Sequence, residues 1–352
     1  MPEKIYGSVR EPDVYSSGGA ALIGTRTNVA HPMASLDVSV LVCTYNRAGL
    51  LAQTLGHIAA QAISPQCRWE LLVIDNNCTD QTLDVVRKYA DDSRIPTLRF
   101  IREPQQGIAH ARRRAFLEAR GNLLVSVDDD CLLEPNWVEQ AIQFAGENPN
   151  VGMFGGRHVI VWERPPNRVA DLYANSLARQ DLGNQRLCLS SKDRTCLVGA
   201  AFVLRREAIV ASGWLESGVL VGRCGEYLGA GEDAEIFYRV RHAGWECWYV
   251  PQLVLSHVVP VDRTTLPYLR RLHQGFGEAE PFLLSLSRSA HPTFFDRVAV
   301  VGWTFGEITR VLARWPKGYV CSSGERPTWL IRMSHAMGCL AGALRYLITG
   351  RA

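Results

Sequence analysis

The chain has 352 residues, of which 47% are hydrophobic and 21% charged, and its net charge at pH 7 is +3. This length predicts a sizeable buried core, in one large domain with appendages or in two smaller domains. The small net charge disfavours a nucleic-acid-binding protein, which usually carries a stronger basic stripe.

The C-terminal part is basic, because residues 262–352 hold 12 Lys and Arg against 6 Asp and Glu. This fits an anionic surface, although a solvated helix face has the same composition. Residues 328–348 are apolar but interrupted by Arg332, His335 and Arg345, which argues against a membrane span. The expectation is a soluble or peripheral protein.

The cysteines and the first residues also bear on location. Ten cysteines are scattered without a CxxC pair or a Cys/His cluster at zinc spacing, which predicts reduced thiols in a cytoplasmic protein. Residues 1–36 are polar and rich in Gly and Ser, without the apolar run of a secretory leader. We expect them to be a loosely ordered leader.

Apolar runs and helical patterns alternate four times between residues 38 and 145. Buried strands are predicted at 38–43, 69–74, 97–101 and 122–127. Helices are predicted at 48–62, 79–90, 107–119 and 137–145. The second of these helices has Thr79 or Asp80 as its expected cap. Four alternations with short links predict an open, mostly parallel sheet with helices on both faces.

The pattern becomes less regular after residue 150. Strands or extended segments are expected at 151–163, 196–204, 248–250 and 253–259. A glycine-rich loop at 218–231 precedes a helix at 232–244, and three more helices are expected near 264–286, 294–314 and 328–348. The predicted domain organisation is a leader at 1–36, an α/β domain at 37–260 with halves 37–150 and 151–260, and a helical region at 261–352.

Three polar segments directly follow predicted strands: TYNR (44–47), DNNCTD (75–80) and DDD (128–130). In open α/β sheets ligands bind outside the carboxyl ends of the strands, so these segments are expected along one edge. Three like charges after an apolar strand repel one another and need an opposing charge. Asp128 and Asp130 can offer hard oxygens to Mg²⁺ or Mn²⁺, although a turn with a helix cap is the structural alternative.

Further candidates follow from local chemistry. Asp75 can accept hydrogen bonds from a nucleobase or ribose, or form an Asx-turn. Arg112, near the start of the helix GIAHARRR, can face a diphosphate, with Arg113 or Arg114 in solvent. Glu232 and Asp233 begin a helix after Gly231.

A carboxylate at this helix start can act as a general base, or merely compensate the helix dipole. His257, at the end of LVLSH, can complete a metal site with Asp130 or be an ordinary core histidine.

Taken in order, these segments resemble the family 2 glycosyltransferases, inverting enzymes with the GT-A fold. The resemblance rests on VSVLVCTYNRAGLL, ELLVIDNNCTDQT, GIAHARRRA, VSVDDDCLLEP, VGAAFVLRREAI, GAGEDAEIFYRVRHAGWECWYVP and LVLSH, over residues 38–258. It implies a Rossmann-like, mostly parallel sheet flanked by helices, followed by the helical extension. It also implies a nucleotide-diphospho-sugar donor, Mn²⁺ or Mg²⁺, and an acceptor hydroxyl on a saccharide, a lipid-linked molecule or another compound.

The resemblance also carries roles over to single positions. Asp233 matches the catalytic base and Glu232 its partner near the acceptor. Asp128, Asp130 and His257 match metal or diphosphate contacts. The donor is expected to contact Thr44, Tyr45, Asn46, Arg47, Asp75, Asn77, Gly107, Arg112, Asp128 and Asp129. The last of these has no separate role in the family pattern.

Two departures and three alternatives accompany the resemblance. Cys78 stands where a small hydroxyl residue is commoner, and the Q-x-x-R-W signature of processive members is absent, which favours transfer of one sugar at a time. A nucleotidyltransferase would need a Gly-rich, basic phosphate loop after the first strand, where TYNRAG stands instead. A non-catalytic sugar-nucleotide-binding protein is a second alternative. A dehydrogenase is weaker, because no G-x-G-x-x-G follows an early strand.

Overall fold

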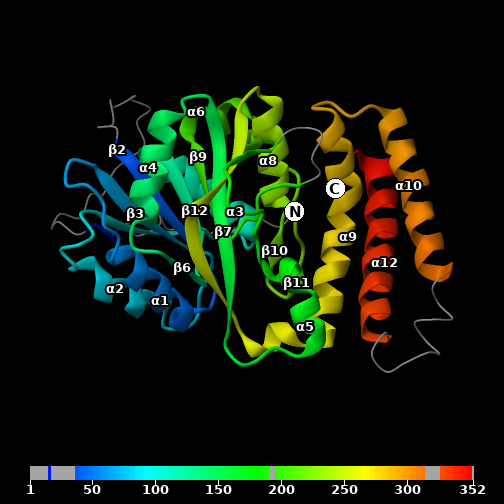
Figure 1. Ribbon diagram of the computed structural model, residues 1–352, viewed down its shortest axis with the longest axis horizontal. Coiled ribbons are helices and arrows are strands. Elements are labelled where there is room, and N and C mark those ends of the chain that lie inside the picture. The colour runs from blue at the N-terminus through cyan, green and yellow to red at the C-terminus, as the bar shows by residue number, and fades with distance from the viewer. Residues whose placement is uncertain (1–14, 17–35, 190–194, 314–325, 351–352) are drawn as a thin grey trace, which may run out of the picture.

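A computed structural model describes residues 15–16, 36–189, 195–313 and 326–350. The described chain forms a sheet covered by helices on both faces, with three long helices packed beside it (Figure 1). The predicted leader lies almost wholly outside the described residues. Two of its residues form the short strand β1 (Tyr15–Ser16), which pairs with β4 at the sheet edge.

The first half of the sheet alternates strands and helices as predicted. Its parallel strands are β2 (Leu36–Thr44), β3 (Trp69–Asp75), β4 (Leu98–Arg102) and β5 (Gly121–Asp128). They lie in the order β4-β3-β2-β5. The helices are α1 (Ala48–Ala59), α2 (Thr82–Ala90), α3 (Ile108–Glu118) and α4 (Trp137–Glu147). The strand order reverses at β2, where an open α/β sheet binds its ligands.

The second half of the sheet mixes directions. The strand β9 (Ala201–Arg205) runs antiparallel between β5 and β7 (Val151–Trp162). Next to β7 lies the parallel strand β12 (Glu246–Val259), and β6 (Cys131–Leu133) pairs antiparallel with β12 at the edge. The remaining short elements are α5 (Arg168–Leu172), η1 (Ala174–Leu177), β8 (Leu187–Cys188), α6 (Arg206–Ala211), α7 (Trp214–Ser217), β10 (Arg223–Cys224), β11 (Tyr227–Leu228), α8 (Glu232–His242) and η2 (Val261–Thr264).

Several predicted element boundaries are wrong, and the helix expected at 48–62, for example, ends at Ala59. The strand expected at 196–204 begins only at Ala201, because the residues before it leave the sheet and line a cavity. The segments expected at 248–250 and 253–259 belong to one strand, β12, whose register shifts between them. The helix expected from residue 79 begins at Thr82, and Asp80 accepts hydrogen bonds from the backbone N–H groups of Thr82 and Ala48. Asp80 therefore joins the starts of two helices.

The core has two parts, one on each face of the sheet. Along β2, Val38, Val40 and Val42 pack with α1, α2 and α4, while Leu41 and Cys43 pack with α3 and α8 on the other face. All five side chains are buried, as the continuous apolar run predicts. The two-sided burial holds the strand ends rigidly, and with them the polar residues that follow.

The C-terminal helices are α9 (Leu266–Arg288), α10 (Phe294–Ala313) and α12 (Arg326–Thr349), close to the predicted ranges. They stand side by side at one end of the molecule, with α9 next to α8 (Figure 1). Backbones of α9 and α12 nearly touch: a Cβ on Gly277 would lie 2.2 Å from the carbonyl oxygen of His335. Within the described ranges, no helix has the length and apolar character needed to span a membrane.

Candidate active site

A cavity of about 620 Å³ opens where β2 and β5 end. The strand ends and α3 line it on one side, and the start of α8 and the face of α9 line it on the other. Eight of the residues predicted from the sequence line it: Thr44, Tyr45, Arg47, Arg112, Asp128, Asp129, Glu232 and Asp233. The fold thus brings together side chains from four separate parts of the chain.

Six other predicted residues do not line this cavity: Asn46, Asp75, Asn77, Gly107, Asp130 and His257. Asp75 accepts a hydrogen bond from the backbone N–H of Cys78, three residues further along the chain, whereas the Asx-turn that the sequence left open would bond residue 77. Asn77 donates to the carbonyl oxygen of Pro104 and so ties its loop to the neighbouring one. In the structure these two side chains support the loops behind the cavity wall.

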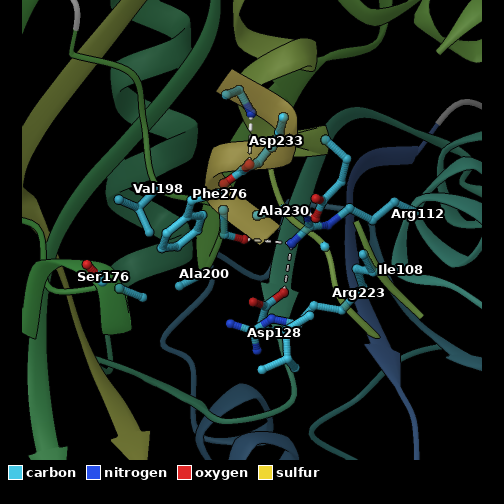
Figure 2. Close-up of a pocket in the computed structure, with 18 of the residues that line it drawn as sticks. Ile108, Arg112, Asp128, Ser176, Val198, Ala200, Arg223, Ala230, Asp233 and Phe276 are labelled. Atoms are coloured by element: carbon cyan, nitrogen blue, oxygen red, sulfur yellow. Dashed lines mark hydrogen bonds and ion pairs between the residues drawn. The ribbon is translucent and has the colours of Figure 1, made fainter. Parts of the chain in front are cut away.

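Arg112 is the centre of a buried polar network (Figure 2). Its guanidinium donates to Asp128 Oδ1 at 2.9 Å, to Glu232 Oε1 at 2.6 Å and to the carbonyl oxygen of Gly199 at 2.8 Å. Of Arg113 and Arg114, one of which was expected in solvent, Arg113 stacks its guanidinium over the Trp214 ring, and Arg114 is partly exposed and pairs with Glu118. Arg112 alone of the three faces the cavity, as predicted.

The other two aspartates of the run are also paired with arginines. Asp129 accepts from Thr44 at 2.7 Å and from Arg47 at 3.2 Å. Asp130 Oδ2 accepts from Arg47 and from Arg263, each at 2.9 Å. Together with Arg112, three guanidinium groups lie against the three aspartates, and Arg112 is shared between Asp128 and Glu232. The protein therefore already offsets much of the repulsion that a bound cation was expected to relieve.

Burial and these arginines shift the acidities of the run in opposite directions. Burial by itself would raise the pKa of Asp130, but His257 and Arg263 outweigh it and hold that pKa well below the usual range. Burial raises the pKa of Asp128, even though Arg112 opposes the shift. Asp130 is thus the most firmly ionised of the three, because its positive neighbours stabilise the carboxylate.

A divalent ion fits one corner of this network. Asp130 Oδ1 lies 3.1 Å from His257 Nε2, both side chains are buried, and Cys131 lies beside them. A carboxylate oxygen and an imidazole nitrogen this close can share a divalent ion: the carboxylate suits Mn²⁺ or Mg²⁺, whereas the imidazole suits later transition metals better. Asp128 lies outside this cluster and contacts Arg112, so its role as a metal ligand stays a prediction.

Glu232 and Asp233 begin α8 at the cavity, after Gly231, whose φ of +95° favours glycine. Burial raises the pKa of Glu232 to about 7, and Asp233 adds to the shift while Arg112 opposes it. A Cβ on Gly199 would lie 2.5 Å from Asp233 Oδ2. Because Gly199 has no Cβ, the Asp233 carboxylate has room to lie on the cavity wall.

Several lining residues escaped the sequence reasoning. Arg263, on η2, is buried and lines the cavity, and its Nη2 has no hydrogen-bond partner among the described residues. Arg223, Phe276 and Glu280 come from the glycine-rich loop and from α9. Their only signal in the sequence is proximity to motif residues: Arg263, for example, follows His257 by six positions. Their approach to the site depends on how the C-terminal helices fold back.

A comparison with protein families gives one match. Residues 39–211 match the model described as glycosyl transferase family 2. Among curated relatives, the validoxylamine A glucosyltransferase of Streptomyces hygroscopicus subsp. limoneus is 37% identical over 105 residues, 30% of this chain and 23% of that protein. The succinoglycan biosynthesis protein ExoM of Rhizobium meliloti is 23% identical over 260 residues, 72% of this chain and 77% of its own. The first match thus spans only about a quarter of its relative's length.

Two solved structures share the fold. A mannosyltransferase from Pyrobaculum calidifontis, in complex with GDP-Man and Mn²⁺, has a TM-score of 0.53 at 19% identity, covering 93% of this chain and 92% of its own. Residues 1–349 of S. aureus TarS, in complex with UDP, have a TM-score of 0.50 at 15% identity, covering 88% and 91%. The likeness includes most of the C-terminal helices, and at these identities it speaks for the fold alone.

Proposed function

Residues 39–211 form a glycosyl transferase family 2 domain with the GT-A fold, and we propose that the protein transfers a single sugar from a nucleotide-diphospho-sugar to an acceptor hydroxyl with inversion. One observation carries this: the Asp233 carboxylate lines the same cavity as Asp128 and Asp129 of the aspartate run and the arginines that contact the run. A general base and an anion-binding wall are the two parts that such a displacement needs.

The proposed roles of the residues that line the cavity follow from their charges. Negative charge develops on the leaving diphosphate as the sugar–phosphate bond breaks, so cations aimed at it lower the barrier. Arg47, Arg112 and Arg263 line the cavity and can supply that charge. Asp233 takes the proton of the attacking hydroxyl, and attack from the face opposite the leaving group inverts the anomeric carbon. Glu232 fixes Arg112 and borders the acceptor side.

The donor-binding role of the loops rests on position and on the relatives. Thr44, Tyr45 and Asn76 line the cavity at the strand ends. The Pyrobaculum calidifontis mannosyltransferase binds GDP-Man with Mn²⁺, which supports a sugar nucleotide and a divalent ion here. Asp130 and His257 do not line the cavity, but Asp130 contacts Arg47 and Arg263, which do, so an ion held there would add positive charge behind that wall. The side chain of Asn46 accepts from the backbone N–H of Thr79 and holds its own loop, so its contribution to donor binding is indirect.

The test is the substitution Asp233→Asn in the full-length protein. General base catalysis typically contributes a factor of about 100 to 10,000, so we expect turnover to fall by that amount while nucleotide affinity stays. Transfer is measured as release of nucleoside diphosphate, and affinity by calorimetry. The control is Asp84→Asn, on the exposed face of α2, which should behave as wild type. Unchanged turnover in Asp233→Asn contradicts the assignment.

The same assay separates the alternatives. A nucleotidyltransferase would release pyrophosphate from a nucleoside triphosphate, and a non-catalytic binding protein would release nothing. The segment after β2 continues directly into α1 without a glycine-rich phosphate loop, which favours the transferase.

The acceptor and its setting are proposed from the C-terminal helices. Exposed apolar side chains form a stripe on α10: Phe294, Phe295, Val298, Phe305 and Leu312. Residues 262–352 also carry a net charge of +6. An apolar stripe on a basic part suits the surface of an anionic membrane. We therefore place the protein at the inner face of the membrane, acting on a lipid-linked or other saccharide acceptor in polysaccharide, cell-envelope or glycoconjugate assembly.

A further inference from the structure

The C-terminal helices bring three metal-ligating side chains together, away from the aspartate run. Glu280 lies on α9, and His335 and Cys339 lie one turn apart on α12. Glu280 Oε2 is 3.0 Å from His335 Nε2 and 3.6 Å from Cys339 Sγ. One ligand atom from each residue lies within 4.8 Å of the others. The proposed transfer reaction gives this cluster no role.

The distances match those of a metal site. Zn–N and Zn–O bonds of about 2.0 Å and Zn–S bonds of about 2.3 Å place tetrahedral ligand atoms about 3.3 to 3.6 Å apart. Glu280 Oε2 lies 3.0 Å from His335 Nε2, just below this range, and 3.6 Å from Cys339 Sγ, at its upper end. The His335 nitrogen that lies 3.6 Å from Cys339 Sγ is Nδ1, whereas Nε2 faces Glu280, so the side chains must turn for one ring nitrogen to share an ion with both partners.

The helix pair holds these ligands in place. A Cβ on Gly277 would lie 2.2 Å from the carbonyl oxygen of His335 and 2.8 Å from the backbone nitrogen of Cys339. Gly277 is three residues from Glu280 on α9. Close backbone contact at that point leaves little freedom in how the two helices sit. A metal would therefore meet a largely formed site, which lowers the cost of binding it.

The chemistry of the three ligands selects the ion. One thiolate, one imidazole and one carboxylate form a mixed set that suits borderline ions such as Zn²⁺, whereas Mn²⁺ and Mg²⁺ prefer oxygen. Burial, aided by Glu280, raises the pKa of Cys339, so the thiol stays protonated until a metal displaces its proton. Glu280 and His335 also line the cavity, so the site has one open side.

We propose that Glu280, His335 and Cys339 bind one zinc ion, or a similar borderline divalent ion, with its fourth position open to the cavity. The ion ties α9 to α12 and adds a positive charge to the wall that faces Asp233. This site is separate from the Asp130–His257 pair and does not depend on the proposed transfer. Its ligand is the metal alone.

The experiment uses Co²⁺ as an optical substitute for zinc in the full-length protein. A thiolate bound to Co²⁺ gives a charge-transfer absorption in the near ultraviolet, which should saturate at one equivalent and disappear when Zn²⁺ is added. The substitution Cys339→Ser should abolish the absorption. His335→Gln should weaken Co²⁺ affinity by about tenfold or more.

The matched control is Cys131→Ser, because Cys131 belongs to the other candidate cluster, with Asp130 and His257. This variant should keep the absorption. The proposal is overturned if the wild type shows no absorption. It is also overturned if the absorption survives in Cys339→Ser and is lost in Cys131→Ser. In either case the three side chains only form hydrogen bonds. Thermal unfolding with Zn²⁺ gives a second measure: the wild type should gain stability, and His335→Gln should not. Since neither assay contains donor or acceptor, their outcome is independent of transfer activity.

Discussion

Glu232 couples the charge of the cavity to pH through Arg112. Its carboxylate is 2.6 Å from the guanidinium, and burial raises its pKa to about 7. Above this pH the ionised carboxylate neutralises Arg112. Below it the carboxyl group is protonated, and the cavity gains one positive charge. A diphosphate should therefore bind more tightly at the lower pH.

We expect the affinity of the wild type for a nucleoside diphosphate to rise between pH 8 and pH 6. In Glu232→Gln the contribution of Glu232 to this rise in affinity should vanish, because the amide does not titrate. Calorimetry of both proteins over this range provides the check, and the titration of the ligand itself is common to both. Parallel pH profiles for the two proteins would contradict the coupling.

Arg263 and a divalent ion compete for the same carboxylate. Arg47 and Arg263 both lie 2.9 Å from Asp130 Oδ2, so an ion held by Asp130 and His257 would lie close to two guanidinium groups. At about 4 Å and an effective dielectric constant of about 20, two unit charges repel by about 4 kcal/mol, so each guanidinium would repel a divalent ion by about 8 kcal/mol. Binding of the ion alone should therefore be weak, and the negative charge of a diphosphate should strengthen it.

We expect Arg263→Gln to bind Mn²⁺ more tightly than the wild type in the absence of nucleotide, and Asp130→Ala to bind it more weakly. The signal of free Mn²⁺ in electron paramagnetic resonance measures both. The assignment of a cation to this site would be contradicted if nucleotide-sugar binding by the wild type did not depend on Mn²⁺. An unchanged Mn²⁺ affinity in Arg263→Gln would contradict it as well.

Among the elements, the pair α9 and α12 depends on glycine. Gly277→Ala places a methyl group against the backbone of α12, 2.2 Å from the oxygen of His335, so one helix must move. Overpacking of this kind costs about 1 to 3 kcal/mol of unfolding free energy. Gly302→Ala on α10 meets no described atom within 4 Å and serves as the control, since alanine favours helix by about 0.8 to 1.0 kcal/mol. Denaturant unfolding of both variants tests this, and equal stabilities would contradict the packing argument.

At the scale of the whole molecule, the charge and the exposed apolar side chains both collect on the C-terminal helices. The side chain of Phe295 is 82% exposed and that of Phe305 54% exposed, on the outer helix α10. We expect the protein to sediment with anionic vesicles, more weakly as salt is added. Phe295→Ser combined with Phe305→Ser should reduce this binding. Leu172→Ser, 66% exposed on α5, should not. Absence of binding by the wild type would refute the membrane proposal.

The sequence predicted the first half of the fold better than the second. Between β2 and α4 the strands are buried on both faces and the helices have one apolar face, so the periodicity reports the structure directly. At residues 197–200 an apolar segment lines a cavity, and its pattern is that of a strand. A periodic apolar pattern shows that residues are buried, but it does not show whether they pack in a sheet or line a cavity. The strand expected from residue 196 is wrong for this reason.

The sequence by itself determined the strand ends, the acidic helix start at Glu232 and Asp233, and the family, because these depend on neighbouring residues. Only the tertiary structure decided what the aspartate run meets. Its partners Arg47, Arg112 and Arg263 lie up to 133 residues away along the chain. The same holds for Glu280, His335 and Cys339, which two helices bring together. Contacts of this kind arise from the packing of distant segments, and a linear pattern carries no record of them.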